Sequence, residues 1–368
     1  MTPRDPTEPP AEGDTRRSSP PPPPSPPNDP GEPSETVASG EVRRFGNYRL
    51  LRELGRGAQG VVWLAEDASL RRKVALKMLT GAGAQSQLTR DRFKREAELT
   101  SKFEHPGICG VHDFGEVDGM PYIAMQYVRG STLASIVEKA RGAAGGAKGG
   151  DTISIAGGGN KGELEDVLRL VERAARALHV AHEAGLVHRD IKPANIMVTT
   201  EGHPVLLDFG LARDIESEGQ TLTQSGQILG TPAYLAPEQI VATRGTVDRR
   251  TDVYALGVTL FECLTLHRPF EGQSWDQLFH AILDGAPPSP RAINPRIPRE
   301  LATVIEVAME REQTRRYPTA EALAEDLRRV RSFEPIQAQA ASTWTRARKW
   351  ARRNPGRATG AAAVVVFA

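Results

Sequence analysis

Residues 187–208 constrain this chain more than any other part of its sequence. Two aspartates, a lysine and an asparagine fall within the stretch, at Asp190, Lys192, Asn195 and Asp208. Carboxylate and amide oxygens are hard ligands that suit Mg²⁺. Acids at this spacing are typical of sites that bind the metal ions of a nucleotide and orient a hydroxyl group toward a phosphate. Any fold of this chain has to bring these side chains together.

The overall composition is that of a folded chain with almost no net charge. The 368 residues carry 47 basic and 46 acidic side chains, a formal charge of +1. This balance gives no whole-chain field that would attract nucleic acid, so we expect no nucleic-acid partner. The two cysteines, Cys109 and Cys263, offer no disulfide framework and fit a reducing compartment. We expect both to be small buried side chains.

The first forty residues differ in composition from the rest. Residues 1–40 contain 13 prolines among acidic and hydroxyl side chains, with almost no large apolar residue. Such a segment cannot bury enough apolar surface to offset its chain entropy, so we expect a disordered proline-rich arm. No hydrophobic run follows Met1, which argues against a secretory signal.

Short alternating runs after the arm predict an antiparallel sheet. Residues 48–54, 61–67 and 73–79 alternate apolar and polar side chains, with glycine-rich or charged breaks between them. The first break carries Gly55, Arg56, Gly57 and Gly60, followed by Val62. Its glycines would let backbone N–H groups approach phosphate oxygens. A dinucleotide-binding fold uses similar glycines before a helix, whereas a strand follows here.

Lys77 lies among apolar residues of the third predicted strand, where an unpaired ammonium group would be costly. A predicted helix over residues 88–103 offers Glu96 as its partner, with Glu98 as the alternative. The Lys77–Glu96 pair would hold the ammonium group toward the phosphates of a nucleotide. Taken alone, Lys77 could equally be an edge-strand lysine whose stem reaches water.

These motifs resemble those of the protein kinase family, and more narrowly the eukaryotic-like serine/threonine kinases of bacteria. The resemblance covers residues 45 to about 330 without a missing block. In order, the motifs are the glycine-rich loop, Val74-Ala75-Leu76-Lys77, Glu96, His188-Arg189-Asp190, Asp208-Phe209-Gly210, Ala236-Pro237-Glu238 and Asp252.

The resemblance implies an α+β, bilobal fold that binds ATP. We expect a small antiparallel β lobe with one key helix over residues 45–128 and a mainly helical large lobe over residues 129–331. Residues 122–128 look like the last small-lobe strand and the hinge. Met125 would then be the gatekeeper, and the backbone of Gln126 and Val128 would meet the adenine. The glycine-rich loop, Val62, Ala75 and Lys77 complete the expected ATP contacts.

A long helix is predicted to deliver the catalytic residues. Apolar side chains recur at helical spacing from Leu164 to Ala181, and the pattern ends near Gly185. By resemblance, Asp190 orients or deprotonates the acceptor hydroxyl and Lys192 neutralises charge on the phosphoryl group. Asn195 and Asp208 would hold Mg²⁺, with Mn²⁺ as a second candidate ion. His188 and Phe209 are expected to brace the site from the core.

Residues 213–230 form a polar stretch with little to bury. We expect Thr223 and Ser225 to be autophosphorylation sites, because of their position before Gly230 and Thr231. Phosphorylation would add about −1.5 to −2 charges, and Arg189 is a ready cation for it. The alternative is that these hydroxyl groups are ordinary polar groups of a loop.

Further family positions have structural roles. Glu238 is expected to pair with Arg316. Asp252, at the start of an apolar helix over residues 253–266, is expected to anchor the backbone of the catalytic loop, the segment that carries His188, Arg189 and Asp190. Residues 140–162 depart from the family pattern, because nine glycines fall between Arg141 and Gly162. We expect a flexible surface insertion there.

The C-terminal residues suggest a membrane anchor. A basic segment over residues 332–357 precedes an apolar run over residues 358–368. That run is shorter than the roughly 20 residues that cross a bilayer, so we expect it to be the start of a transmembrane helix that is incomplete in this chain. The kinase domain would be cytoplasmic and tethered to the inner face of the plasma membrane. The alternative is a soluble kinase with an apolar tail.

The expected activity is transfer of the γ-phosphate of ATP to serine or threonine hydroxyls of proteins in bacterial signal transduction. Protein substrates are the expected partners, together with a second copy of the chain for autophosphorylation in trans. A pseudokinase scaffold and a small-molecule phosphotransferase are the alternatives. The pseudokinase is disfavoured because all the expected catalytic residues are present: Lys77, Glu96, Asp190, Asn195 and Asp208. The small-molecule phosphotransferase is disfavoured by the peptide-docking motifs at Thr231 and at residues 236–238.

Overall fold

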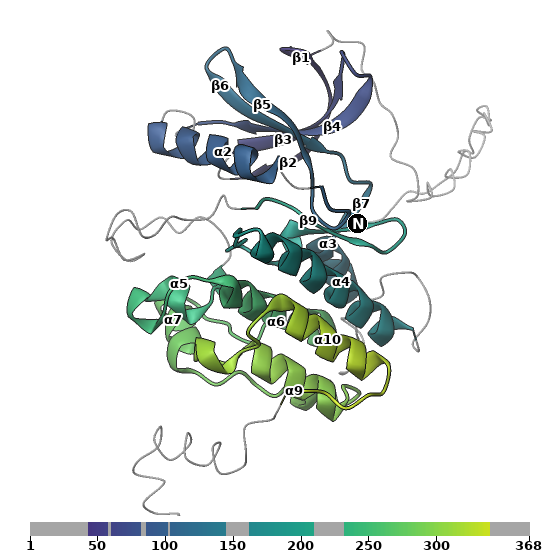
Figure 1. The fold of residues 1–368 in the computed structure, drawn as a ribbon, viewed down its shortest axis with the longest axis vertical. Helices are drawn as coiled ribbons and strands as arrows, with labels where there is room; N and C mark the ends of the chain where they lie inside the picture. The colour runs from purple at the N-terminus through teal and green to yellow at the C-terminus, as the bar shows by residue number, and fades with distance from the viewer. Residues whose placement is uncertain are drawn as a thin grey trace, which may run out of the picture. The chain divides into compact units, whose positions relative to one another are not determined.

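Strands dominate the first half of the described structure and helices the second (Figure 1). The computed structural model describes residues 43–57, 60–81, 86–101, 104–144, 162–209 and 232–338. We call β1–β6 with α2 the sheet part, and α3–α10 with β7–β9 the helical part. The α+β, two-part arrangement expected from the sequence is confirmed.

The sheet part is a six-stranded antiparallel sheet with the order β1-β2-β3-β4-β6-β5. Its strands are β1 (Arg44–Phe45), β2 (Tyr48–Gly57), β3 (Gly60–Asp67), β4 (Arg72–Leu79), β5 (Val111–Val117) and β6 (Met120–Gln126). The alternating runs predicted β2, β3 and β4; the structure extends β2 by three residues and β3 and β4 by one residue each. The glycine-rich break joins β2 to a strand and not to a helix, as expected.

The strand register places several of the expected ATP contacts on one face of the sheet. Val62 lies opposite Lys77, which in turn lies opposite Ile123. In the next row on the same face, Ala75 lies opposite Met125. Side chains two residues apart on a strand share a face, so both rows point to the same side.

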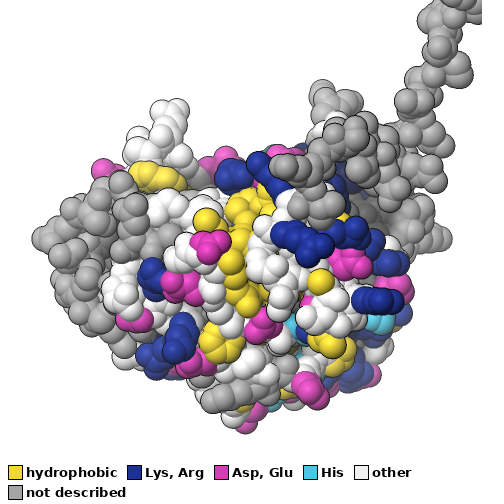
Figure 2. Space-filling view, turned by 90° about the horizontal axis from the view of Figure 1, so that it is seen from above, with side chains coloured by type: hydrophobic (Ala, Val, Ile, Leu, Met, Phe, Trp, Pro, Cys, Tyr) yellow, Lys and Arg dark blue, Asp and Glu magenta, His cyan; other side chains and the backbone are white. Residues whose placement is uncertain are grey.

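The two faces of the sheet have different apolar neighbours. Helix α2 (Gln87–Thr100) packs Phe93 and Ala97 against Leu79 and Ile123, on the face that carries Lys77. The other face has its own buried cluster, edged by partly exposed apolar side chains. Figure 2, which looks down on this end of the molecule, shows hydrophobic side chains gathered in a band beside Lys and Arg groups.

The helical part contains a small antiparallel sheet besides its helices. Its strands are β7 (Gly130–Thr132), β8 (Ile196–Thr199) and β9 (Pro204–Leu206). The helices are α3 (Leu133–Ala144), α4 (Glu163–Glu183), α5 (Pro237–Ile240), α6 (Arg249–Thr265), α7 (Trp275–Asp284), α8 (Pro290–Ile293), α9 (Arg299–Ala308) and α10 (Ala320–Arg331). Single turns of 3-10 helix lie at Pro193–Asn195, Pro232–Tyr234, Ala242–Arg244 and Gln313–Arg315.

Helices α4 and α6 form the centre of the helical part. The apolar stripe of α4 is buried, and three acidic residues in its first turn complement the helix dipole. Helix α6 is buried on all sides; Asp248 caps its N-terminus, and Leu266 ends it in a left-handed conformation. Both helices contribute to one hydrophobic cluster that runs through the helical part.

Both cysteines are buried and free, as expected. Burial raises the pKa of the Cys109 thiol to about 12, and it also raises the pKa of Cys263. Neither thiol is therefore a ready nucleophile at neutral pH.

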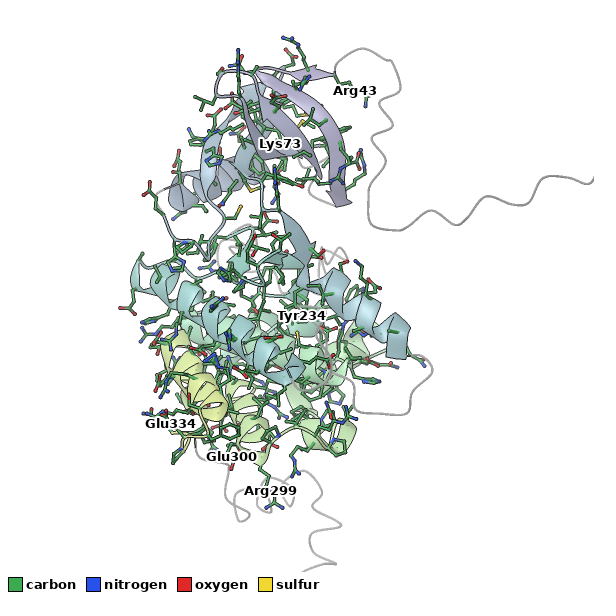
Figure 3. The ribbon with its side chains drawn as sticks, turned by 90° about the vertical axis from the view of Figure 1, so that its right-hand side faces the viewer. Arg43, Lys73, Tyr234, Arg299, Glu300 and Glu334 are labelled. Carbon is green, nitrogen blue, oxygen red and sulfur yellow. The ribbon has the colours of Figure 1, made fainter. Side chains whose placement is uncertain are left out.

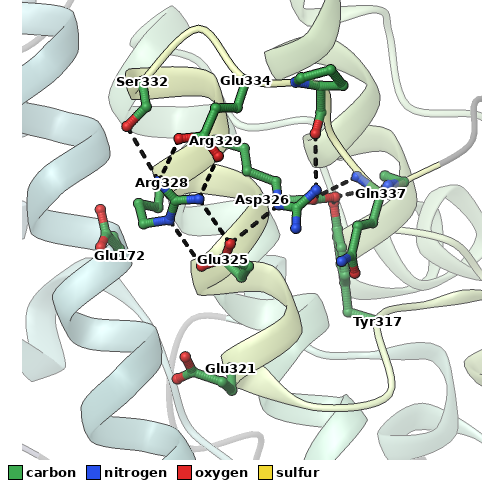
Figure 4. A network of polar contacts seen from close by, with 12 residues as sticks. Glu172, Tyr317, Glu321, Glu325, Asp326, Arg328, Arg329, Ser332, Glu334 and Gln337 are labelled. Atoms are coloured by element: carbon green, nitrogen blue, oxygen red, sulfur yellow. Dashed lines mark hydrogen bonds and ion pairs between the residues drawn. The ribbon is translucent and has the colours of Figure 1, made fainter.

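The chain that follows α10 folds back against it (Figure 4). Asp326, 1% exposed, accepts hydrogen bonds from the backbone N–H groups of Gln337 (2.7 Å) and Ala338 (2.8 Å) and from the hydroxyl of Tyr317 (2.9 Å). Arg328 pairs with Glu334 at 2.6 Å. The beginning of the expected basic linker is thus attached to the helical part.

Several expectations fall outside the described residues: the proline-rich arm over residues 1–40, the central part of the glycine-rich insertion, and the basic and apolar segments beyond residue 338. Among the helices that the structure describes, none combines the length and the apolar character needed to cross a bilayer.

Candidate active site

Packing within the protein requires glycine at only one of the three glycine positions described near the β2–β3 turn. Gly60 has a φ of +151°, and a Cβ there would lie 2.0 Å from the backbone oxygen of Met78. A Cβ on Gly55 or Gly57 would meet nothing within 4 Å. The packing of the protein explains Gly60, but it does not require glycine at the other two positions. Open space at Gly55 and Gly57 suits a ligand that approaches the backbone closely, such as a phosphate group. Arg56 pairs with Glu53 at 2.7 Å in the same strand.

Lys77 contacts the helical part directly. Its Nζ lies 2.9 Å from Oδ1 of Asp208, although the two residues are far apart in the sequence. Only 7% of Lys77 is exposed, which excludes the reading of an edge-strand lysine that reaches water. Burial opposes ionisation of Asp208, but the charge of Lys77 outweighs it and lowers the pKa of Asp208 below its ordinary value. Asp208 is therefore a carboxylate at neutral pH.

The expected Lys77–Glu96 pair cannot be read from the structure, because the Glu96 side chain lies outside the described residues; its backbone belongs to α2. Glu98, the alternative, is exposed and lies 3.9 Å from Lys94 on the same helix. The pairing of Lys77 with Glu96 stays a prediction.

Asp190, Lys192 and Asn195 form one hydrogen-bonded group. Nζ of Lys192 lies 2.7 Å from Oδ2 of Asp190. Nδ2 of Asn195 donates to the same oxygen and to the backbone oxygen of Asp190, both at 2.9 Å. The first turn after the loop, Pro193–Asn195, begins with proline, which is preorganised for a helical turn. The carboxylate of Asp190 is therefore held in place by two neighbours while a third of its side chain stays exposed.

A backbone hydrogen bond connects this group to Asp208. The N–H of Leu207 donates to the backbone oxygen of Asn195 at 2.9 Å. The imidazole Nε2 of His188 lies 2.8 Å from the backbone oxygen of Leu207. The ring of His188 also packs on that of Phe209, with 4.6 Å between centroids. Both rings are buried, which confirms their expected bracing role.

Asp252 anchors the catalytic loop, as expected. Its carboxylate, fully buried, accepts hydrogen bonds from the backbone N–H groups of His188 (2.8 Å) and Arg189 (2.7 Å). Nε2 of His182 on α4 lies 2.8 Å from the same carboxylate. The sequence gave no sign of this contact, since no local pattern links His182 to Asp252. The anchor also holds the positive φ of Arg189, +66°.

A further contact, which the sequence did not predict, joins the loop to the segment before α6. Nε2 of Gln239 donates to the backbone oxygen of Arg189 at 2.8 Å, and its Oε1 accepts from the backbone N–H of Ala236 at 3.0 Å. Arg189, the residue before Asp190, is thus held by Asp252 through its N–H group and by Gln239 through its backbone oxygen.

The residues expected to meet adenine lie at the end of β6. Met125 is partly buried and Gln126 is exposed. The backbone N–H of Gln126 donates to the oxygen of Gly110 at 2.8 Å, and the thiol of Cys109 lies 3.5 Å from the backbone oxygen of Gln126. Val128 follows and is partly buried.

Glu238 and Arg316 form the expected ion pair. The two side chains, 1% and 0% exposed, meet in a bidentate contact of 2.7 and 2.8 Å. Arg316 also lies over the ring of Tyr254, 4.8 Å from its centroid. This pair fixes the segment over residues 236–238 to the connection between α9 and α10.

The residues present fit a nucleotide-bound divalent cation. The Asp208 carboxylate is ionised, and the Asn195 amide is held beside the loop. Oxygen ligands of this kind suit Mg²⁺ or Mn²⁺, which are commonly held by one or two carboxylates together with substrate phosphates. No cluster of three or more His, Cys, Asp or Glu side chains among the described residues could cage a metal alone. Thr223 and Ser225 lie outside the described residues.

The sequence of the chain is similar to those of known protein kinases. Residues 48–327 match the model of the protein kinase domain. A probable serine/threonine-protein kinase of Streptomyces coelicolor is 36% identical over 82% of this chain and 42% of its own length. The serine/threonine-protein kinase PknB of Mycobacterium tuberculosis is 36% identical over 79% of this chain and 44% of its own. The chain therefore spans less than half the length of these relatives.

A solved structure shows the same fold. The crystal structure of the PknI kinase domain of Mycobacterium tuberculosis aligns with a TM-score of 0.60 and 28% identity, covering 80% of this chain and 100% of that domain. The matched domain model and the relatives at 36% identity, which align with about four fifths of this chain, show its family. This chain belongs to the protein kinase family.

Proposed function

We propose that the chain is an ATP-dependent serine/threonine protein kinase. The observation that carries the proposal is the 2.9 Å contact of Lys77 with Asp208, next to the hydrogen-bonded group around Asp190. The fold thus brings together the buried ammonium group of Lys77, the ionised carboxylate of Asp208 and the carboxylate of Asp190, which come from separate parts of the sequence. Positioning and charge stabilisation supply most of the catalysis in phosphoryl transfer.

Asp190 orients the acceptor hydroxyl and accepts its proton. The hydrogen bonds from Lys192 and Asn195 hold its carboxylate in one direction, which supports this role. Lys192 carries a positive charge beside the carboxylate, so it can also neutralise charge on the transferring phosphoryl group. A lysine two residues after the acid matches the serine/threonine pattern of the family.

The nucleotide lies against the face of the sheet that carries Val62, Ala75, Lys77 and Met125. Lys77 binds phosphate oxygens, with Glu96 as its partner in the active state. Gly55, Arg56, Gly57 and Gly60 cover the phosphates, and the backbone of Gln126 and Val128 meets the adenine. Asn195 and Asp208 hold the metal ion, for which we propose Mg²⁺ with Mn²⁺ as a substitute. The bound ion supplies positive charge that offsets the phosphates.

Transfer of phosphate from radiolabelled ATP to a generic protein acceptor tests the proposal. The wild-type chain labels the protein in the presence of Mg²⁺, and Asp190→Asn reduces labelling by at least about a hundredfold. Arg169→Gln, which removes an exposed ion pair on α4, serves as the matched control and keeps full activity. If ATP binds but neither protein labels the acceptor, the chain is not an active protein kinase.

We also propose that Thr223 and Ser225 are autophosphorylated, with a second copy of the chain as the partner that acts in trans. Their place in the sequence between residue 210 and the segment over residues 236–238 supports this. Mass spectrometry after incubation with ATP should detect phosphate on one of them. A fully active chain without phosphate there contradicts the proposal.

The domain limits and the cellular place are proposals too. We propose a small lobe over residues 45–128 and a large lobe over residues 129–331 with an insertion over residues 140–162. The arginines between residues 346 and 357, followed by the apolar run over residues 358–368, support a cytoplasmic domain tethered to the inner face of the plasma membrane. Sedimentation of a longer gene product with membranes tests this tether.

A further inference from the structure

Glu262 is a buried carboxylate that the proposed chemistry does not use. It lies in the last turn of α6 and is 2% exposed. Burying a carboxylate is costly unless cations and hydrogen bonds satisfy it. Its partners come from three other segments of the helical part, so the side chain connects elements that are distant in the sequence.

The two oxygens of Glu262 serve different segments. Oε2 accepts a hydrogen bond of 2.5 Å from the hydroxyl of Tyr234. Oε1 lies 2.5 Å from a guanidinium nitrogen of Arg141 and 3.5 Å from Nε of Arg268. Arg268 also lies over the Tyr234 ring, 5.9 Å from its centroid. Burial and Glu262 together raise the pKa of Tyr234, so the phenol stays protonated and donates.

Arg141 comes from the last turn of α3, so the first residues of the insertion expected over residues 140–162 are helical and not part of a flexible loop. Besides its contact with Glu262, it donates from Nε to the backbone oxygen of Leu266 at 2.7 Å. Leu266 ends α6 with a φ of +58°. Arg141 therefore fixes both the carboxylate and the end of the helix that carries it, a geometry that a planar guanidinium provides and an ammonium group does not.

Tyr234 belongs to the segment that leads to the catalytic loop. It lies within the helical part (Figure 3), in the turn Pro232–Tyr234, which precedes Ala236. From there the chain reaches Gln239, whose side chain binds Arg189 next to Asp190. The segment over residues 232–239 is thus held at one end by Glu262 and at the other by the catalytic loop.

We infer that Arg141 is a positioning residue for the protein substrate, which acts through Glu262 and Tyr234 on the segment over residues 232–239. This inference rests on the proposed function, because the segment carries the motif expected to dock the acceptor peptide. ATP binds on the sheet face around Lys77, to which Arg141 makes no contact that the structure describes. Arg141 therefore governs the KM for the protein acceptor and not the KM for ATP.

Steady-state kinetics with myelin basic protein as the acceptor test the inference. Arg141→Gln raises the KM for this protein by roughly fivefold to tenfold, the scale expected when one charge-assisted contact is lost, and leaves the KM for ATP within about twofold. Arg141→Lys, which keeps the charge but not the forked geometry, has an intermediate effect. Arg169→Gln, an exposed arginine on α4, leaves both constants unchanged. An unchanged KM for the protein acceptor in Arg141→Gln overturns the inference.

Tyr234→Phe provides a second route that keeps the side chain's shape. It removes only the hydroxyl that donates to Glu262. Because both changes act through the same carboxylate, their effects on the KM for the protein acceptor are less than additive in the double variant. Fully additive effects mean that Arg141 and Tyr234 act independently, which overturns the coupling.

Hydrogen exchange separates this inference from the proposed function. In the Asp190→Asn background, where no transfer is needed, Arg141→Gln increases the exchange rates of the amides over residues 232–239 by about fivefold or more. If the wild-type chain labels no acceptor, the proposed function fails, and this measurement still decides the inference. Unchanged exchange in that segment overturns it whatever the activity.

Discussion

At the scale of single residues, the site combines groups whose identity the sequence revealed with contacts that it did not. Asp190, Lys192, Asn195 and Asp208 stood out because their types and spacing carry the chemistry. The ion pair between Lys77 and Asp208 had no signal, because no periodicity or spacing links residues on separate elements. Glu262 had only a weak signal, as an acid within the mostly apolar stretch over residues 253–266.

Substitution by alanine is expected to have different effects at Gly57 and Gly60, although both belong to the same turn. Gly60→Ala forces a Cβ into the oxygen of Met78 at a positive φ, so it lowers the unfolding temperature. Gly57→Ala meets no protein atom, so it keeps the unfolding temperature but weakens ATP binding. Thermal melts together with nucleotide titrations check both. Equal losses of stability in the two variants contradict the assignment of open space at Gly57.

The ion pair of Lys77 predicts a dependence of stability on pH. The pKa of Asp208 is lowered in the fold, so the pair stabilises the protein above the ordinary carboxyl value of 3.8 and the contribution is lost as the pH falls below it. Lys77→Met therefore unfolds at lower urea concentration than wild type at about pH 5, and the difference shrinks at lower pH.

Urea unfolding curves at several pH values measure this difference. Lys94→Met, which removes an exposed lysine from α2, is the matched control and shows no such trend. A gap between wild type and Lys77→Met that is independent of pH contradicts the role of Asp208. Phosphate transfer by Lys77→Met falls by roughly a hundredfold or more, because a preorganised cation is lost.

At the scale of elements, segments with a strong hydrophobic period were predicted well, whereas short or fully buried elements were not. The stripe over residues 164–181 corresponds to α4 (Glu163–Glu183), and the alternating runs correspond to β2, β3 and β4. Strands β7, β8 and β9 are too short to show a period, and they pair only because the helical part brings them together. Helix α6 is buried on all sides, so its mostly apolar sequence predicts where it begins and ends to within a few residues but not which elements surround it.

The buried pair of Glu238 and Arg316 joins α5 to the connection between α9 and α10, and it leads to a prediction at this scale. Arg316→Met leaves Glu238 buried without its cation, and we expect a loss of about 3–5 kcal/mol in the free energy of unfolding. Arg315→Met, at the neighbouring position, removes an exposed pair with Glu312 and should change stability little. Equilibrium unfolding in urea measures both. Similar small losses in the two variants would show that the buried contact does not stabilise the fold.

At the scale of the molecule, the sheet part and the helical part meet through contacts close to the active site. The backbone of Leu206 in β9 exchanges hydrogen bonds of 2.9 Å with Gly107 and Cys109, just before β5. Asp208 follows two residues later and contacts Lys77. The backbone contact therefore sets where Asp208 meets the sheet. The resemblance predicted two parts with a nucleotide between them, but not the hydrogen bonds that join them.

Binding of nucleotide and metal should stabilise the whole domain. A ligand at a hundred times its Kd adds about 2.7 kcal/mol to the free energy of unfolding, so Mg-ATP raises the unfolding temperature. Asp208→Asn removes the anionic oxygen that would hold the ion, and we expect most of the metal-dependent part of the rise to disappear. Thermal melts in the presence of ATP, with either Mg²⁺ or EDTA added, measure the metal-dependent rise in unfolding temperature. An equal rise with EDTA contradicts a metal ligand at Asp208.

The attachment of residues 337 and 338 to Asp326 has a mechanical consequence. Tension applied to the chain beyond residue 338 reaches α10 first, through two backbone amides and one buried carboxylate. Helix α10 packs against α4 and α9, so the load reaches the most extensive hydrophobic cluster among the residues that the structure describes. A load on this part of the chain therefore passes from α10 into the packed helices of the helical part.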